Sequence, residues 1–232
     1  MNLYLNNQKR DRHLEEYINK LCVCPICFHC LNSPQKDLML VGGGKSTQSE
    51  SFLYNTIMKI VNIDYDPPKE DFENRIQNLK GDFYRLVLNY TNCFDEIWSL
   101  YSLPLYSPTA KDVKLFFYRC VISLKNHGVL RVFPIEEETV NKMHTRDADY
   151  DMTSFECRES VFVALNKLKQ YGIQYEIIRH DNEDLERKED TIIISIDFTD
   201  SDKDKLNILL LNQCDKLLSE DDGYMTEVNI VN

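Results

Sequence analysis

Short apolar runs alternate with amphipathic segments along most of the chain. Runs typical of buried strands are 37–41, 60–64, 82–88, 94–101 and 129–135. Segments with the helical spacing of apolar residues are 10–21, 51–60, 68–79, 109–128 and 154–172. Strands that alternate with helices predict a mainly parallel sheet covered on both faces.

Two later apolar runs change the last part of this pattern. Residues 175–180 and 191–198 are strand-like, and a highly charged stretch separates them. Two strands joined by an exposed loop predict a hairpin, and hence one antiparallel strand. We therefore expect an α/β fold with a seven-stranded, mostly parallel sheet, helices on both faces and a final antiparallel strand.

Local signals mark helix ends and the division of the chain. Gly128 fits a C-terminal cap for the helix that begins at 109. Thr153 opens the sequence TSFE, a capping-box pattern for the next helix. A helix over 203–218 and an acidic tail follow. The expected parts are an N-terminal helix and Cys-rich segment packing on the core (1–35), the main α/β domain (36–200), and a C-terminal helix with its tail (201–232).

Charge narrows the class of partner. The 38 acidic and 27 basic residues give a formal net charge of −11. Proteins that clamp long nucleic acid usually present a basic face, because neutralising phosphates supplies most of their affinity. The composition therefore favours a small-molecule or protein partner over nucleic acid. No apolar run approaches the roughly 20 residues that a membrane span needs, so no membrane association is expected.

The N-terminal sequence and the cysteines bear on the compartment. The stretch MNLYLNNQKRDRHLEEY has no apolar signal core. Eight cysteines without such a signal indicate reduced thiols rather than a disulfide framework. We expect a cytoplasmic protein.

Three glycines, Gly42 to Gly44, directly follow the first predicted strand. Such turns hold phosphates or nucleotides. A P-loop would need its first glycine at Met39, inside the strand, which disfavours ATP. A dinucleotide fingerprint would need a small residue at Thr47, which weakens that interpretation. A tight corner with no ligand is a further alternative.

Acidic residues follow the glycines at regular points of the pattern. Asp64 ends the second predicted strand, at the distance from Gly44 where an acid accepts hydrogen bonds from a ribose diol. Asp64 could instead cap the helix that follows. Asp82 stands after Gly81, where an ordinary turn residue is the alternative. Asp95 opens the predicted strand 94–101.

Taken in order, these motifs resemble the class I S-adenosylmethionine-dependent methyltransferases over residues 36–198. The resemblance implies a Rossmann-like sheet whose glycine turn, Gly42 to Gly44, lies near the methionine part of the cofactor. It implies that Asp64 holds the ribose and that Asp82 lies near the adenine. Asp95 would open the strand that leads to the transfer site.

Two positions depart from the family pattern. The acid usual two residues before the first glycine is Leu40, and the third glycine is Ser46. The change at Leu40 removes a usual anchor for the cofactor's amino group, for which Glu50 and Asp95 are the nearest replacements in sequence. A non-catalytic binding or regulatory protein on the same scaffold is therefore the alternative to an enzyme, and an NAD-dependent oxidoreductase is a third.

The main expectation is methyl transfer to a small molecule or a protein. The resemblance places the acceptor beside the segment SLYSLPLYSP, where Tyr101 and Tyr106 would line the pocket or hydrogen-bond the acceptor. His144, in a polar stretch, is a candidate base. Aromatic packing and a solvated histidine are the alternatives. The segment lacks an Asn-Pro-Pro-Tyr motif, which disfavours methylation of nucleic-acid bases.

The stretch CVCPICFHC holds four cysteines, which are Cys22, Cys24, Cys27 and Cys30. Two residues between thiolates allow both to bind one tetrahedral zinc ion. The remaining cysteines form no second pair, so all four ligands would come from this one turn. A zinc site and simple buried or free thiols are both open.

Overall fold

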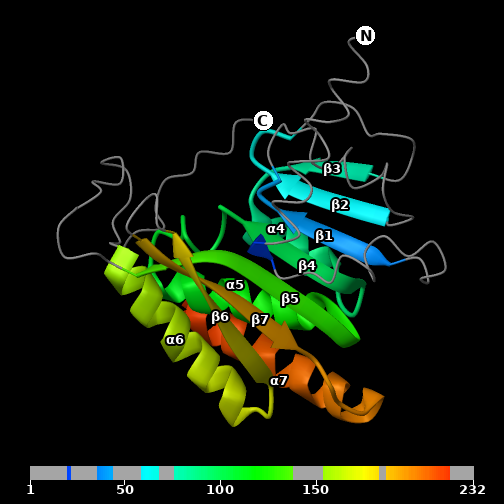
Figure 1. Ribbon diagram of the computed structural model, residues 1–232. Helices are drawn as coiled ribbons and strands as arrows, with labels where there is room; N and C mark the ends of the chain where they lie inside the picture. Colours follow the sequence, from blue (N-terminus) through cyan, green and yellow to red (C-terminus); the bar gives the residue numbers. More distant parts are fainter. Residues whose placement is uncertain are drawn as a thin grey trace, which may run out of the picture.

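A computed structural model of the protein describes residues 20–21, 36–43, 59–67, 76–137, 154–182 and 187–219. Within these ranges the chain forms one sheet with helices against it (Figure 1). The strands are β1 (Asp37–Val41), β2 (Lys59–Asp64), β3 (Ile76–Lys80), β4 (Phe94–Leu100), β5 (Leu124–Glu137), β6 (Gln174–Asn182) and β7 (Arg187–Ser195). The helices are α4 (Phe83–Leu86), the 3₁₀ turn η1 (Val87–Asn89), α5 (Ala110–Ser123), α6 (Ser154–Gln170) and α7 (Asp200–Ser219).

The seven strands lie in the order β3-β2-β1-β4-β5-β7-β6. Neighbours from β3 to β5 are parallel, and β7 is antiparallel to both β5 and β6. This confirms the expected α/β fold with a mostly parallel sheet and a late antiparallel strand. The chain's order across the sheet reverses between β1 and β4. Open α/β sheets bind ligands beyond the carboxyl ends of the strands at such a switch point.

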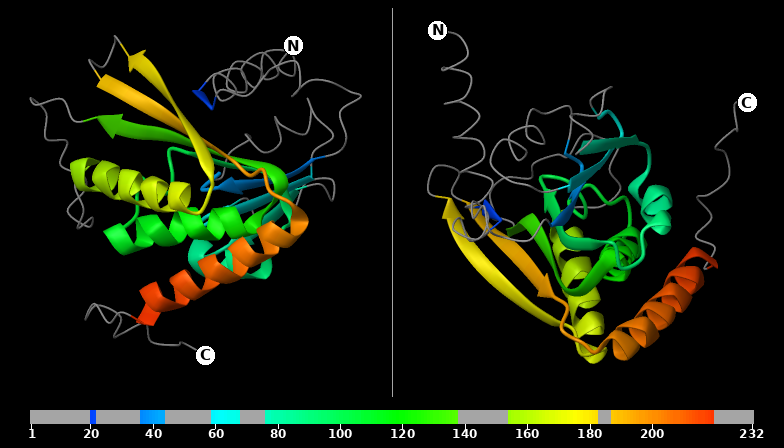
Figure 2. Two further views of the ribbon diagram at one scale, coloured as in Figure 1. Left: turned by 90° about the horizontal axis from the view of Figure 1, so that it is seen from below. Right: turned by 90° about the vertical axis from the view of Figure 1, so that its right-hand side faces the viewer.

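One face of the sheet carries the main hydrophobic core. Helices α5, α6 and α7 lie side by side beneath it (Figure 2). The core combines strand residues with residues of these helices, among them Met39, Ile97, Leu130, Phe116, Val161 and Leu210. In the part of the chain that the structure describes, every helix from α4 onward packs on this face.

The opposite face of the sheet holds a buried polar cluster. Glu96 of β4 accepts a hydrogen bond from Trp98 Nε1 at 2.7 Å and pairs with Lys36 Nζ at 2.7 Å. Arg131 Nε lies 3.5 Å from Glu96, and Arg131 Nη1 donates to the Leu21 carbonyl at 3.3 Å. Buried charges persist where they are paired in this way. The cluster ties Leu21 to the face of the sheet opposite helices α5, α6 and α7.

The third strand lies elsewhere than the sequence indicated. Residues 82–88, predicted as a strand, form α4 and the start of η1, and β3 (Ile76–Lys80) begins inside the segment 68–79 that was predicted as a helix. Asp82 caps α4 by accepting a hydrogen bond from the Tyr84 amide at 3.0 Å. The buried Phe83 and Val87 are four residues apart, a spacing that fits a helical turn as well as a strand.

The predicted helix 109–128 also ends early. Helix α5 stops at Ser123, and β5 begins at the next residue. Gly128 lies in β5, where a β-carbon would come within 3.1 Å of the Phe94 carbonyl oxygen. The β4–β5 register shifts beside Phe94. Gly128 therefore serves a close approach of two backbones at an irregular pairing rather than a helix cap.

Some predictions fall outside the description. Most of the predicted helix 10–21, most of the predicted helix 51–60 and Thr153 lie beyond the residues that the structure describes. Helix α7 includes the predicted helix 203–218 and packs its buried Leu206, Leu210 and Cys214 into the main core. Within the described ranges, none of the helices has the length and apolar content that crossing a membrane requires.

Candidate functional site

The carboxyl ends of β1, β2 and β3 are joined by backbone hydrogen bonds just beyond the strands. The Gly42 amide donates to the Ile63 carbonyl at 2.8 Å, and the Gly81 amide donates to the Asp64 carbonyl at 3.0 Å. The residues that follow these strands therefore form one continuous row. The row ends at β4, which lies on the other side of the switch point.

The first two glycines of the turn have separate structural reasons. Gly42 has φ +67°, and a β-carbon there would lie 2.5 Å from Ser102 Cβ and still closer to the Ser102 hydroxyl. A β-carbon on Gly43 would lie 2.5 Å from Asn62 Oδ1. The missing side chains thus leave room for Ser102, just beyond β4, and for Asn62 of β2. Gly44 lies outside the described residues.

Asp64 stands beside this turn, at the end of β2. Its Oδ1 accepts a hydrogen bond from the Asp66 amide at 2.7 Å, which is a local turn contact. Its Oδ2 lies 3.8 Å from the position of a β-carbon on Gly42. One oxygen of the carboxylate thus supports the chain while the other lies beside the glycine turn, and the contact of Asp64 with a ribose stays a prediction.

Asp82 lies one strand further along the row. Besides capping α4, it has Arg85 Nε at 4.0 Å, a loose pair on the surface. This is the turn role that the sequence left as an alternative. The position after β3 also leaves Asp82 at the same edge as Asp64, so its contact with adenine stays a prediction.

Asp95 does not belong to this row. It lies at the amino end of β4, where it accepts a hydrogen bond from the Asp37 amide at 2.8 Å and pairs with Lys125 Nζ at 3.0 Å. The five residue steps from Asp95 to Leu100 span about 17 Å of strand. The sequence marked the start of the strand, whereas ligands bind at its end. Asp95 therefore also drops out as a replacement for the acid missing at Leu40.

Tyr101, directly after β4, has an unusual backbone. Its φ is +50°, a conformation that is costly for a bulky side chain and is often found at functional sites. Its amide donates to the Phe133 carbonyl at 2.8 Å, and its ring packs edge-on against Phe133. The side chain is 46% exposed. Tyr101 thus stands next to Ser102 at the switch point, and its contact with an acceptor stays a prediction.

The other two predicted acceptor-side residues are placed less tightly. Tyr106 lies in the turn that leads to α5 and is 43% exposed. His144 lies outside the described residues.

The structure adds a histidine that the sequence did not single out. His180 of β6 packs edge-on against Phe133, the same ring that Tyr101 contacts. Thr191 donates to the Lys20 carbonyl at 2.6 Å, so His180 Nε2 donates to the Thr191 hydroxyl at 2.7 Å. Burial, and then the charge of Lys20, lower the pKa of His180. A neutral imidazole therefore packs against the same Phe133 ring as Tyr101. Only the pairing of β6 with β7 reveals it.

The structure does not test the predicted zinc site. Cys22, Cys24, Cys27 and Cys30 lie outside the described residues. Within the description, no group of three or more His, Cys, Asp or Glu side chains could hold a metal ion. Burial raises the pKa of the Cys214 thiol to about 11, as expected for a core cysteine. The zinc site stays a prediction.

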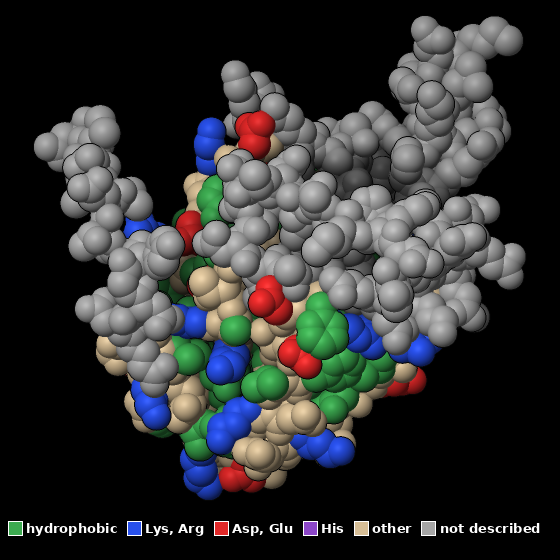
Figure 3. Space-filling view, turned by 90° about the vertical axis from the view of Figure 1, so that its left-hand side faces the viewer, with side chains coloured by type: hydrophobic (Ala, Val, Ile, Leu, Met, Phe, Trp, Pro, Cys, Tyr) green, Lys and Arg blue, Asp and Glu red, His purple; other side chains and the backbone are tan. Residues whose placement is uncertain are grey.

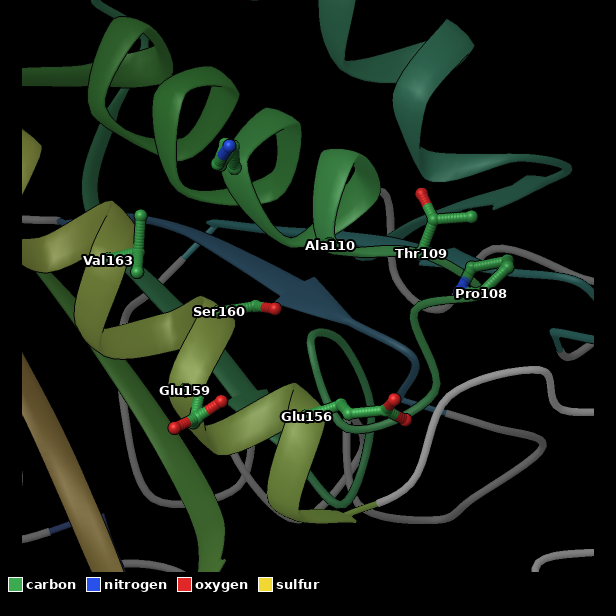
Figure 4. Close-up of a pocket in the computed structure, with 8 residues that line it drawn as sticks. Pro108, Thr109, Ala110, Glu156, Glu159, Ser160 and Val163 are labelled. Carbon is green, nitrogen blue, oxygen red and sulfur yellow. The ribbon is translucent and has the colours of Figure 1, made fainter. Parts of the chain in front are cut away.

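A separate hollow of about 480 Å³ lies between the first turns of α5 and α6 (Figure 4). Glu156 and Ser160 project toward it from α6, and Pro108 to Ala110 form the opposite wall. The described surface on the side shown in Figure 3 mixes hydrophobic, basic and acidic side chains. Neither feature carries the glycine turn or the row of strand ends.

Comparisons with known proteins identify the fold. No protein-family model and no curated protein matches the sequence. Among solved structures, 1,6-didemethyltoxoflavin-N1-methyltransferase from Burkholderia thailandensis, which contains S-adenosylhomocysteine, has a TM-score of 0.53 at 13% identity. The match covers 85% of this chain and 90% of that one. The chain has the class I methyltransferase fold.

Other proteins with this fold define how far the likeness reaches. The similar structures are mostly S-adenosylmethionine-dependent methyltransferases. The [4+2]-cyclase SpnF matches as well, with a TM-score of 0.53 at 12% identity over 81% of each chain. Spermidine synthase from Thermotoga maritima has a TM-score of only 0.46 at 13% identity. That match covers 78% of this chain, which spans 59% of the length of the synthase. At these sequence identities the structural similarity establishes the methyltransferase fold but does not identify the reaction.

Proposed function

We propose that the protein transfers a methyl group from S-adenosylmethionine to a small molecule or a protein side chain. One observation carries the proposal: Asp64 Oδ2 lies 3.8 Å from the β-carbon position of Gly42, at the point where the strand order reverses. A carboxylate beside a glycine turn suits a ribose diol next to the rest of an adenosyl cofactor. The preponderance of S-adenosylmethionine-dependent enzymes among similar structures supports it.

The residues present fit this cofactor. Asp64 would hold the ribose hydroxyls, Asp82 would lie on the adenine side, and the turn from Gly42 would accommodate the methionine part. When bound, S-adenosylmethionine supplies a methyl group on a positively charged sulfur. The protein's own task is then to hold the acceptor in line with that methyl group and to keep water away.

Residues on the β4 side of the switch point suit the acceptor. The exposed Tyr101 would hydrogen-bond and orient it, with Tyr106 and His144 as further candidates. His180 is the group on this side whose neutral form is favoured at neutral pH, because its pKa is lowered. A neutral imidazole can accept a proton from an acceptor hydroxyl or amine.

The second candidate is a binding or regulatory protein that does not catalyse. The specific observation in its favour is Leu40, which is 5% exposed and lies within the sheet where the family usually has an acid. Losing a hydrogen bond to the cofactor's charged amino group would weaken binding by roughly ten- to a hundredfold. That loss still permits an enzyme, but it also suits a protein that has stopped using the cofactor.

Titration calorimetry with S-adenosylhomocysteine, S-adenosylmethionine, NAD and ATP separates the candidates. Binding of the first two and not the others is the expected result. Transfer of a labelled methyl group to a fractionated lysate then distinguishes the enzyme from the binding protein. Binding of NAD or ATP alone would contradict the proposal. If none of the four ligands binds, the proposal fails and a binding or regulatory protein that does not use this cofactor remains.

A further inference from the structure

Asn62 is a fully buried amide whose oxygen lacks a partner among the described residues. Its side chain is 0% exposed, and Nδ2 donates to Asn78 Oδ1 at 3.0 Å. Its Oδ1 accepts no hydrogen bond within the described structure. Native proteins pair nearly all buried polar atoms, so an orphaned acceptor points to a partner that binds there.

The orphaned oxygen lies directly against the glycine turn. It stands 2.5 Å from the position of a β-carbon on Gly43, so any side chain there would cover it. Asn62 precedes Asp64 by two residues on β2, and alternate residues of a strand share a face. The orphaned oxygen and the proposed ribose carboxylate therefore project from the same face of the sheet, at its carboxyl edge.

Asn62 is also the cross-strand neighbour of Leu40. The two residues occupy paired positions on β1 and β2, so their side chains lie next to each other on that face. Leu40 is the position where the family pattern has an acid. A polar oxygen is thus present one strand away from the place where the carboxylate is missing.

We propose that Asn62 replaces the missing acid, with its Oδ1 accepting a hydrogen bond from the ammonium group of the cofactor's methionine part. This inference rests on the proposed function. A neutral amide oxygen binds an ammonium group less strongly than a carboxylate does, because it adds no charge attraction. The site would therefore bind the amino-acid end of the cofactor, but more weakly than a site with a carboxylate at position 40 would.

Two ligands separate this role from simple support of the turn. S-adenosylhomocysteine carries the ammonium group, whereas methylthioadenosine has the same adenosine and thioether without it. Calorimetry on the full chain should show tighter binding of S-adenosylhomocysteine. Asn62→Leu should weaken S-adenosylhomocysteine roughly ten- to a hundredfold and leave methylthioadenosine unchanged. Asn62→Asp should tighten S-adenosylhomocysteine alone.

The control is Asn207→Leu, because Asn207 is a buried asparagine of α7 that hydrogen-bonds Asn92 and lies on the helix face of the sheet. It should lower the melting temperature without changing the ratio of the two affinities. If Asn62→Leu does not fold, the affinities of the two ligands for Asn62→Asp provide the test, because aspartate keeps the side-chain volume. Equal changes for both ligands, or no change, would overturn the role of Asn62 and leave the proposed function standing. Failure of the unmodified protein to bind either ligand would overturn both.

Discussion

Ser102, just beyond β4, stands so close to Gly42, just beyond β1, that a β-carbon at position 42 would lie 2.5 Å from the Ser102 β-carbon. The two residues meet at the switch point of the sheet, which is where this fold binds ligands. The contact fixes how closely the ends of β1 and β4 approach. It also means that the glycine is required by the protein itself, whatever the ligand.

Gly42→Ala should therefore lower the free energy of unfolding by about 2–4 kcal/mol, from the positive φ and the clash with Ser102 together. Urea unfolding measures it. Gly172 has φ +88°, yet its β-carbon would lie at an ordinary 3.5 Å from Phe198, so Gly172→Ala should show the backbone cost alone. Adding Ser102→Gly to Gly42→Ala should recover the difference. Equal losses for the two alanine variants would mean that the Ser102 contact is unimportant.

Much of the sheet could be predicted because buried parallel strands appear as short apolar runs. β1, β2 and β4 stand out in this way, as does the late hairpin of β6 and β7. Residues 82–88 were wrongly predicted as a strand, because apolar residues four apart suit a turn of helix and a strand equally. The Asp82 cap decides for the helix, and such a cap is visible in sequence only when the helix is already suspected.

The sequence predicts the candidate-site residues that lie at strand ends, but not those whose importance comes from contacts between strands. Gly42 directly follows an apolar run, and Asp64 and Tyr101 end the next two runs that form neighbouring strands. Asp95 entered the candidate site through the family resemblance, although the sequence already placed it at the amino end of its strand, away from the carboxyl ends where ligands bind. Ser102, Asn62 and His180 matter through neighbours on other strands, and pairing across a sheet is not written in the local pattern.

Asp64→Asn should weaken S-adenosylhomocysteine binding by about 1.5–3 kcal/mol, because a hydrogen bond to a charged group is lost from the ribose. Isothermal titration measures this. Asp95→Asn is the matched control, since that carboxylate lies at the amino end of β4 against Lys125 and should not change the affinity. A drop at Asp95 with none at Asp64 would reverse the placement of the cofactor along the sheet.

Lys203 gives the protein a pH-dependent stability far from the site. It is 2% exposed, and its Nζ donates to the Val121 carbonyl at 2.9 Å and to Asn207 Oδ1 at 2.5 Å. Burial lowers its pKa to about 8. Because the folded pKa lies below the unfolded value, the unfolded chain binds the proton more readily. The charge therefore destabilises the fold fully below pH 8, and this effect disappears toward the unfolded pKa of about 10.4.

Lys203→Met should accordingly reduce the rise in unfolding free energy between pH 8 and 10, by at most about 3 kcal/mol across that window. At pH 7 its net effect is smaller than that figure, because Val121 and Asn207 lose a donor. Urea unfolding at several pH values measures the difference between variant and wild type, in which other titrating groups cancel. Lys205→Met changes an exposed neighbour and should leave the slope alone. Parallel slopes for Lys203→Met and wild type would show that the amine remains solvated.

Substitutions of Tyr101 can distinguish the two interpretations that the sequence left open, namely contact with the acceptor and aromatic packing. Its φ of +50° costs stability that glycine would recover, on the order of 1–2 kcal/mol. Its ring is 46% exposed and contributes an edge contact to Phe133 of about 0.5–1.5 kcal/mol. The backbone relief opposes the lost ring contact and the freedom that glycine adds to the unfolded chain, so Tyr101→Gly should cost about 1–2 kcal/mol less than a Tyr→Gly change at a residue with negative φ.

Tyr106 is the matched control, because it is 43% exposed and is not among the described residues with positive φ. Tyr106→Gly gains no relief and should cost about 1 kcal/mol or more, since glycine adds freedom to the unfolded chain. If Tyr101 orients the acceptor, Tyr101→Gly should keep its affinity for S-adenosylhomocysteine and lose labelled-methyl transfer. Marked destabilisation of Tyr101→Gly, with transfer unaffected in Tyr101→Phe, would instead make the residue a packing element at the end of β4. Strained backbone conformations cluster at functional sites. A strained backbone that carries an exposed ring is therefore expected where that side chain contacts a ligand.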